Sequence, residues 1–173
     1  MATGSLIKID EEIVTSAVAS VTLTGIDSTY DVYMIKINNM KSTVDGDDLR
    51  IRVTESGTAN STANYDFASK FLRTLVAFGN LSATNQTQFD TGNIGNVGGE
   101  SHNQIMYCFN ANNASEYTFF TNEIIQIASS SEMSGEQGGF VFTSNSSVDG
   151  VYFFCNSGNI DIGSSFVLYG LKK

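Results

Sequence analysis

Residues 49–54 read Leu-Arg-Ile-Arg-Val-Thr, and this short stretch carries the pattern that decides the fold. Leu49, Ile51 and Val53 alternate with polar residues along it. A period of two places the apolar side chains on one face of an extended chain and the polar ones on the other. The stretch therefore predicts a half-buried β-strand.

The same alternation recurs along the chain. We predict further strands at residues 21–24, 33–38, 105–109, 117–121, 123–127, 140–143, 151–155 and 166–171. Clusters rich in Gly, Asn, Asp and Ser separate them, at residues 42–48, 96–101, 132–139, 146–150 and 155–159. Many short strands at such spacing predict an all-β fold, an antiparallel β-sandwich of jelly-roll type with an N-terminal extended arm.

Three segments depart from the simple alternation of apolar and polar residues. Tyr65–Phe78 has apolar residues at both helical and alternating spacing, so a helix stays open although we favour a strand. The polar stretch Gly79–Asn103 predicts a long loop, which in a compact domain is usually functional or held by a neighbour. In Phe166–Leu171 both faces are apolar, which predicts a central strand or one covered by another subunit.

The length of 173 residues fits one domain. We expect residues 1–15 to form an arm or an ordinary first strand, and residues 16–173 to form the jelly-roll domain. The chain has no proline, a residue that often guards edge strands, so we expect partner subunits to protect the edges. The arm could add a strand to a partner's sheet and so make oligomer contacts. Its apolar residues are Leu6, Ile7, Ile9 and Ile13.

Composition excludes several functions. The 18 acidic residues against 9 basic ones give a net charge of −9, which repels phosphate backbones and argues against a nucleic-acid partner. No apolar run approaches the roughly 20 residues that span a bilayer, so no membrane partner is expected. The start of the chain lacks the pattern of a signal peptide, so we expect synthesis in the cytosol. Cys108 and Cys155 lie in apolar runs, which favours buried free thiols over a disulfide.

Few residues suggest chemistry, and we expect no enzyme activity, catalytic residue or cofactor. His102 is the one histidine, and without a Gly-x-Ser-x-Gly elbow it is best explained as a solvated loop residue. Asp45, Asp47 and Asp48 could hold calcium through carboxylate oxygens, but no glutamate closes a calcium loop. A strand connection explains these acids better, and we expect no metal site.

Three segments, in this order, resemble a family of small virion proteins of marine bacteriophages. They are Ser5–Ile37 with its core Thr24–Tyr33, Tyr107–Glu123 with the run Phe109–Tyr117, and Ser157–Lys173. The resemblance covers nearly the whole chain. The resemblance implies that six residues have structural roles in turns and strands. They are Gly25, Asp27, Tyr30, Tyr33, Tyr169 and Gly170.

The resemblance implies a jelly-roll protein of the virion, without enzyme activity, made in the bacterial host cytoplasm. We expect a homotrimer that contacts other capsid or tail proteins and decorates the capsid or forms a short appendage. One alternative is a tail-fibre protein that binds a host surface glycan. A further alternative is a virion-associated carbohydrate-active enzyme, although no pair of carboxylates stands out.

Overall fold

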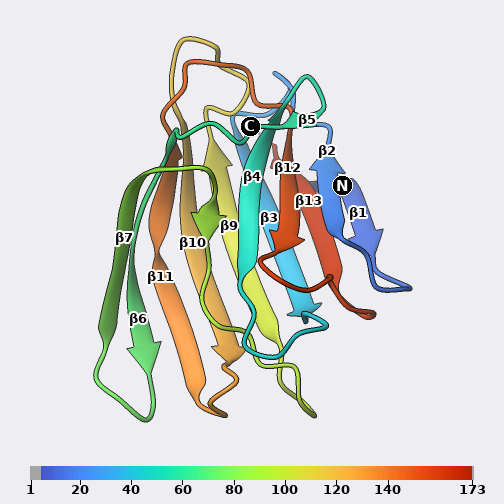
Figure 1. Cartoon of the computed structure of the whole chain (residues 1–173). Helices are drawn as coiled ribbons and strands as arrows, with labels where there is room; N and C mark the ends of the chain where they lie inside the picture. The colour runs from blue at the N-terminus through green and yellow to red at the C-terminus, as the bar shows by residue number, and fades with distance from the viewer. Residues whose placement is uncertain (1–4, 173) are drawn as a thin grey trace.

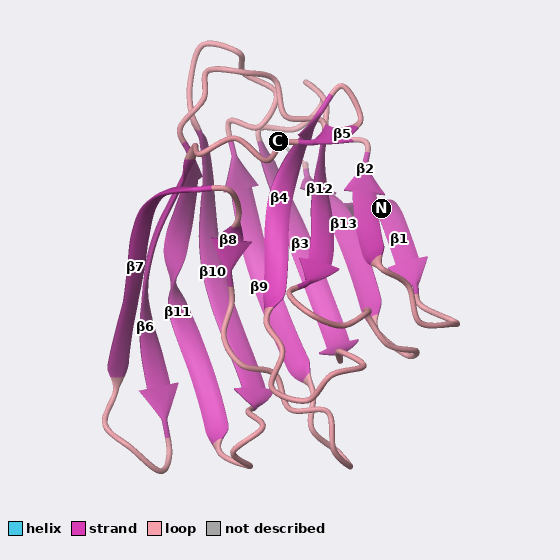
Figure 2. Ribbon diagram, viewed as in Figure 1, coloured by secondary structure: helices cyan, strands magenta, loops and turns pink. Residues whose placement is uncertain are grey.

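The computed structural model describes residues 5–172, and these residues form strands and loops without a helix (Figure 2). The strands are β1 (Leu6–Ile13), β2 (Ser20–Thr24), β3 (Val32–Met40), β4 (Leu49–Glu55), β5 (Thr58–Ala59), β6 (Tyr65–Arg73), β7 (Gly79–Gln86), β8 (Phe89–Asp90), β9 (His102–Phe109), β10 (Thr118–Ile127), β11 (Met133–Phe142), β12 (Gly150–Cys155) and β13 (Ser165–Leu171). All pairings between these strands are antiparallel, so the predicted all-β antiparallel fold is confirmed.

Two sheets of unequal width face each other. The larger, eight-stranded sheet runs β1-β13-β3-β9-β10-β11-β6-β7, and the smaller runs β2-β12-β4-β5 with β8 also paired to β4. In Figure 1 the smaller sheet lies in front of β13, β3 and β9, while β11, β6 and β7 extend beyond it on the left. The arrangement is sandwich-like, with its loops gathered at two ends (Figure 2).

The alternation read from the sequence is confirmed in the strands that carry it. Leu49, Ile51 and Val53 on β4 are fully buried, and the arginines between them are partly exposed. β13 lies between β1 and β3, as its two apolar faces predict. Val167 on its outer face is only 6% exposed.

The ambiguous segment Tyr65–Phe78 is a strand as far as Arg73, and residues 74–78 turn into β7. The prediction of a long loop over Gly79–Asn103 is wrong, because this stretch contains β7, β8 and the start of β9. Polar composition concealed β7, which is an edge strand with half of its residues exposed. A true loop remains only at residues 91–101.

Two further boundaries differ from the prediction. The two strands predicted at residues 117–121 and 123–127 are one strand, β10 (Thr118–Ile127). Residues 133–139, read as part of a turn cluster, belong to β11. The glycines there serve close packing, because a Cβ at Gly138 would overlap the backbone of Ala68 and Ser69 on β6.

Aromatic rings fill the space where the wide part of the large sheet meets β8. The Phe89 ring stacks on that of Phe140, with centroids 4.5 Å apart, and meets the rings of Tyr65 and Phe120 at 4.8 and 5.6 Å. Phe89 itself has no exposed surface. This cluster connects the short strand β8 with β6, β10 and β11.

Candidate functional site

The signature residues begin at the turn that follows β2. Gly25 has a φ of +92°, and a Cβ there would lie 2.8 Å from Cγ2 of Ile9. The Thr29 N–H donates to Oδ1 of Asp27 at 2.8 Å, and hydrogen bonds from Thr29 lower the pKa of the Asp27 carboxyl. The buried Tyr33 hydroxyl donates to the Asp27 carbonyl oxygen at 2.6 Å. The turn is therefore held by backbone geometry and two side chains.

The other signature residues lie against the same turn. The rings of Tyr30 and Tyr33 meet edge to face with centroids 5.8 Å apart. Gly170 on β13 leaves room for the Tyr30 ring, which a Cβ would overlap. Tyr169 is half-buried and pairs across the sheet with Lys8 and Met34. These contacts pack the turn onto the large sheet, and they are structural in character.

The three candidate calcium ligands do not converge. Asp47 is 4% exposed, and its carboxylate accepts hydrogen bonds from Ser42 Oγ at 2.7 Å and from the N–H groups of Gly158 at 2.8 Å and Ser157 at 3.1 Å. Burial raises its pKa, but these hydrogen bonds outweigh burial, so the net pKa is below its ordinary value. Asp47 thereby ties the β3–β4 connection to the β12–β13 connection.

Asp45 and Asp48 serve other contacts. The exposed Asp45 accepts from the backbone N–H of Asn96 at 3.1 Å. Burial raises the pKa of the Asp48 carboxyl, and the nearby charges of Asp90 and Asp47 raise it further. Within residues 5–172, no cluster of three or more His, Cys, Asp or Glu side chains is arranged to hold a metal ion.

The interpretation of His102 as a solvated loop residue is wrong. His102 opens β9 and has no exposed surface, because it faces the interior of the sandwich. Its Nδ1 lies 2.7 Å from Oε1 of Gln126, and its Nε2 lies 2.9 Å from Oε1 of Gln104. Burial lowers the pKa of His102, while the two amide contacts raise it. Both ring nitrogens are engaged by amides, so the ring has no nucleophile to activate.

The two cysteines are buried free thiols, as the sequence predicts. Burial raises the pKa of Cys155 to about 11 and that of Cys108 further above its usual range. A thiol with a raised pKa is a weak nucleophile near neutrality. Neither cysteine is therefore suited to act as a nucleophile.

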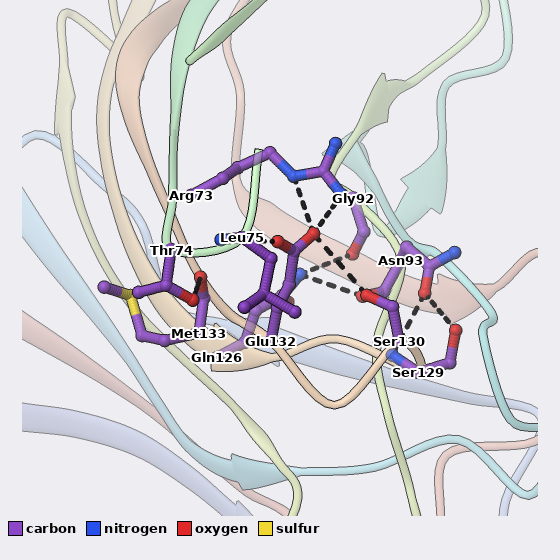
Figure 3. A network of polar contacts seen from close by, with 10 residues as sticks. All are labelled: Arg73, Thr74, Leu75, Gly92, Asn93, Gln126, Ser129, Ser130, Glu132 and Met133. Atoms are coloured by element: carbon purple, nitrogen blue, oxygen red, sulfur yellow. Dashed lines mark hydrogen bonds and ion pairs between the residues drawn. The ribbon is translucent and has the colours of Figure 1, made fainter. Parts of the chain in front are cut away.

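A polar pocket of about 310 Å³ lies at the end of the large sheet where β6, β10 and β11 meet the loop 91–101. Figure 3 shows its wall, with Arg73 reaching across to Glu132. The Arg73 guanidinium forms an ion pair with Glu132, whose Oε2 also accepts from the Leu75 N–H at 3.3 Å. The bond from Arg73 contributes most to a pKa of Glu132 below its usual value. Sequence reasoning missed this pair, because β6 and the β10–β11 turn are far apart in the chain.

The same pocket is bounded by the loop that crosses the sheet. Nε2 of Gln126 donates to the carbonyl oxygens of Gly92 at 3.2 Å and Asn93 at 3.0 Å (Figure 3). Ser129 Oγ donates to Oδ1 of Asn93 at 2.6 Å. Phe71 supplies an apolar surface to the pocket. Most of the residues that line the pocket are polar, and Phe71 provides one aromatic side.

The outward face of the large sheet carries exposed apolar side chains, a second feature that sequence reasoning missed. On β9 and β10, Ile105, Tyr107, Phe119 and Ile125 are 41%, 37%, 42% and 52% exposed. We call the outward-facing residues of the eight strands the outer face. The signal was present in the sequence, because β9 and β10 have apolar residues at both alternating positions.

The apolar residues predicted to make oligomer or virion contacts lie on the edge strand β1, paired with β13. Leu6, Ile7 and Ile13 are exposed, and Ile9 packs towards the core beside Gly25. Residues 1–4 of the predicted arm lie outside the described residues.

A comparison with protein-family models, curated proteins and solved structures finds no match to this chain. Among residues 5–172 there is no helix long and apolar enough to cross a bilayer.

Proposed function

We propose that this chain is a non-enzymatic structural protein of a bacteriophage virion, which assembles into a homotrimer through its outer face. The exposed apolar surface of that face is the observation that carries the proposal. Contiguous exposed apolar surface on a soluble domain marks an interaction site. The resemblance of the sequence to phage virion proteins supplies the setting, capsid decoration or a short appendage, and the trimeric state.

We further propose that the fold is a jelly roll, and the strand order supports this. Taken in chain order, β1, β2, β3, β4, β8, β9, β12 and β13 can be numbered one to eight. One sheet then reads one-eight-three-six and the other reads two-seven-four-five, which is the jelly-roll order. β6–β7 and β10–β11 are hairpins inserted into this plan, and both extend the large sheet.

A second copy of the chain is the partner whose charge best suits the outer face. The chain as a whole carries 18 acids and 9 bases, so two copies repel each other over most of their surface. The charged side chains that point outward from the large sheet are balanced. They are three lysines and three acids, namely Lys8, Lys36 and Lys70, and Glu11, Asp66 and Glu123. Copies can therefore approach each other on this face with little repulsion.

The size of the face also suits a stable interface. Eight strands about 4.8 Å apart give a width of about 34 Å, and strands of typical length here are about 25 Å long. The product, roughly 800 Å², is close to what one protein buries in an interface of standard size, and in a trimer each copy would divide this area between two neighbours.

Changing Phe119 to Glu should disrupt assembly. The charge would be buried in the interface, which weakens association by at least about 30-fold. Light scattering coupled to size-exclusion chromatography should give a multiple of the 18.6 kDa chain mass for the native protein, three-fold for a trimer, and a lower mass for F119E. Ile162→Glu is the matched control, because Ile162 is 60% exposed in the β12–β13 loop, off the outer face. A monomeric native protein, or F119E with unchanged mass, would contradict the interface.

The virion setting has its own test, the copy number of this protein in purified phage particles by mass spectrometry. Hundreds of copies would support capsid decoration, and a few per particle would support an appendage. Absence from particles would overturn the setting while leaving the interface experiment unaffected.

One observation favours the alternative function of binding a host glycan. The 310 Å³ pocket combines the Phe71 ring with Asn93 and Arg73, and sugar sites use an aromatic surface beside hydrogen-bonding groups. In that case the native protein should bind a glycan saturably, and Asn93→Ala should weaken binding about 10-fold. Equal binding by native protein and N93A on a glycan array would reject this site.

A further inference from the structure

Two buried titratable side chains on the inner face of the large sheet are joined by two amides. His102 is fully buried and Glu136 is 3% exposed. Nε2 of His102 lies 2.9 Å from Oε1 of Gln104, and Nε2 of Gln104 donates to Oδ1 of Asn122 at 2.6 Å. Nδ2 of Asn122 in turn donates to Oε1 of Glu136 at 3.3 Å. The four side chains form one hydrogen-bonded chain across β9, β10 and β11.

The other ring nitrogen of His102 fixes one end of this chain. Nδ1 lies 2.7 Å from Oε1 of Gln126. The Gln126 amide cannot reverse without cost, because its NH₂ donates to the carbonyl oxygens of Gly92 and Asn93, which only accept. An oxygen therefore faces Nδ1, and Nδ1 must carry a hydrogen.

With one titratable proton, two arrangements satisfy every contact in the chain. With an imidazolium and a carboxylate, both amides are oriented as the structure has them. With a neutral imidazole and a carboxylic acid, Gln104 and Asn122 are both reversed, so that their NH₂ groups point towards His102. Each arrangement contains one titratable proton in total.

Any other proton count is unfavourable. A second proton leaves a buried imidazolium beside a neutral carboxylic acid, so no carboxylate balances its charge. Loss of the one proton makes two acceptors meet at one contact, which is at Nδ1 or Nε2 while the amides are oriented as in the structure. That mismatch is relieved if Gln126 turns its NH₂ towards Nδ1, and Gln126 then loses the carbonyl oxygens of Gly92 and Asn93.

We propose that His102 and Glu136 hold one proton between them, and that this proton fastens loop residues 92–93 to the sheet through Gln126. When the proton is lost, Gln126 turns away from the carbonyl oxygens of Gly92 and Asn93, and this part of the loop is no longer bound to the sheet. Gln126 lines the polar pocket, so solvent reaches the edge of the network there.

The electrostatics agree with this geometry. Burial is the largest cause both of the lowered pKa of His102 and of the raised pKa of Glu136, so the pair resists a second proton and retains the first. Charged groups on the elements packed against the pair contribute to neither shift. They are Lys36 on β3, Lys70 and Arg73 on β6, Asp90 and Glu100 around the loop, Glu123 on β10 and Glu132 in the β10–β11 turn.

The sign of the pH dependence follows from proton counting. Well above the ordinary histidine pKa of about 6.5, an unfolded chain holds almost no proton on either group, whereas the folded pair holds one. Stability therefore falls as pH rises, and the unfolding equilibrium constant should increase by about 10-fold from pH 7 to pH 8. Glu136→Gln mimics the protonated carboxyl and cannot release a proton, so E136Q should lack this increase.

Urea unfolding of the native protein, E136Q and the control Glu116→Gln at pH 7 and pH 8 tests the proposal. Glu116 is exposed in the connection between β9 and β10, so E116Q should follow the native protein. Parallel behaviour of the native protein and E136Q would overturn the shared proton.

Nitrogen NMR of the native protein gives a second readout that needs no variant. The chain has one histidine, so its ring signals are unambiguous. We expect Nδ1 to keep its hydrogen from pH 5 to pH 8, with no ring titration near pH 6.5. A titration midpoint near 6.5 would overturn the proposal even if E136Q failed to fold.

Discussion

Replacing Phe89 with alanine should lower the free energy of unfolding by about 3–5 kcal/mol. Phe89 lies on a strand of only two residues, yet its ring has no exposed surface and contacts three other rings. Removal of the ring leaves a cavity between β8 and the large sheet, and the rigid aromatic neighbours cannot close it. Urea denaturation followed by circular dichroism measures the change.

Phe78→Ala is the matched control for this prediction. Phe78 is 61% exposed in the β6–β7 turn, so the same substitution there should change the free energy of unfolding by less than about 0.5 kcal/mol. A loss below about 1 kcal/mol for F89A would show that the aromatic cluster does not hold β8 in place.

Asp47→Ala should cost about 3 kcal/mol, because it removes one acceptor from several donors at once. The N–H groups of Ser157 and Gly158 and the Ser42 hydroxyl would lose their partner in a place with little water. Asp47→Asn should cost less, since it keeps one oxygen acceptor. Asp45→Ala, two residues away and exposed, should cost less than about 1 kcal/mol.

The contribution of Asp47 also has a defined pH dependence. Its folded pKa is lowered, so the unfolded chain takes up a proton first as pH falls. The stabilisation is present above an unfolded pKa of about 3.9 and is lost as pH falls through the lower, folded value. The difference in stability between native protein and D47N should therefore shrink in acid, and a constant difference down to pH 2 would contradict this role.

Alternation in the sequence predicted those strands in which one face is apolar and the other polar. β4 was clear for this reason, because its buried Leu49, Ile51 and Val53 alternate with Arg50 and Arg52. β7 has only two apolar side chains that pack against the core, Leu81 and Ala83, and it is an edge strand on an overhanging part of the sheet. In β11 the glycines that resemble a turn allow close backbone approach to β6. A local sequence pattern does not show which strand lies at an edge, or which strands approach each other closely.

The candidate sites were less predictable than the fold. The sequence indicated correctly that the cysteines are buried thiols, but it placed His102 in a solvated loop. The burial of His102 depends on Gln104 and Gln126, two polar residues that face the interior only because of strand register. Contacts between strands distant in the chain, such as Arg73 with Glu132, give no local signal at all.

The two hairpins β6–β7 and β10–β11 give the large sheet most of its width. Without them it would have four strands and a width of about 14 Å, too narrow for an interface of standard size. The order of the remaining strands in the two sheets would be unchanged. The inward side chains of the hairpins belong to the core, whereas their outward side chains do not. Evolution could therefore alter the outward residues of β6, β7, β10 and β11, and with them the proposed self-association, while the inward residues stay the same.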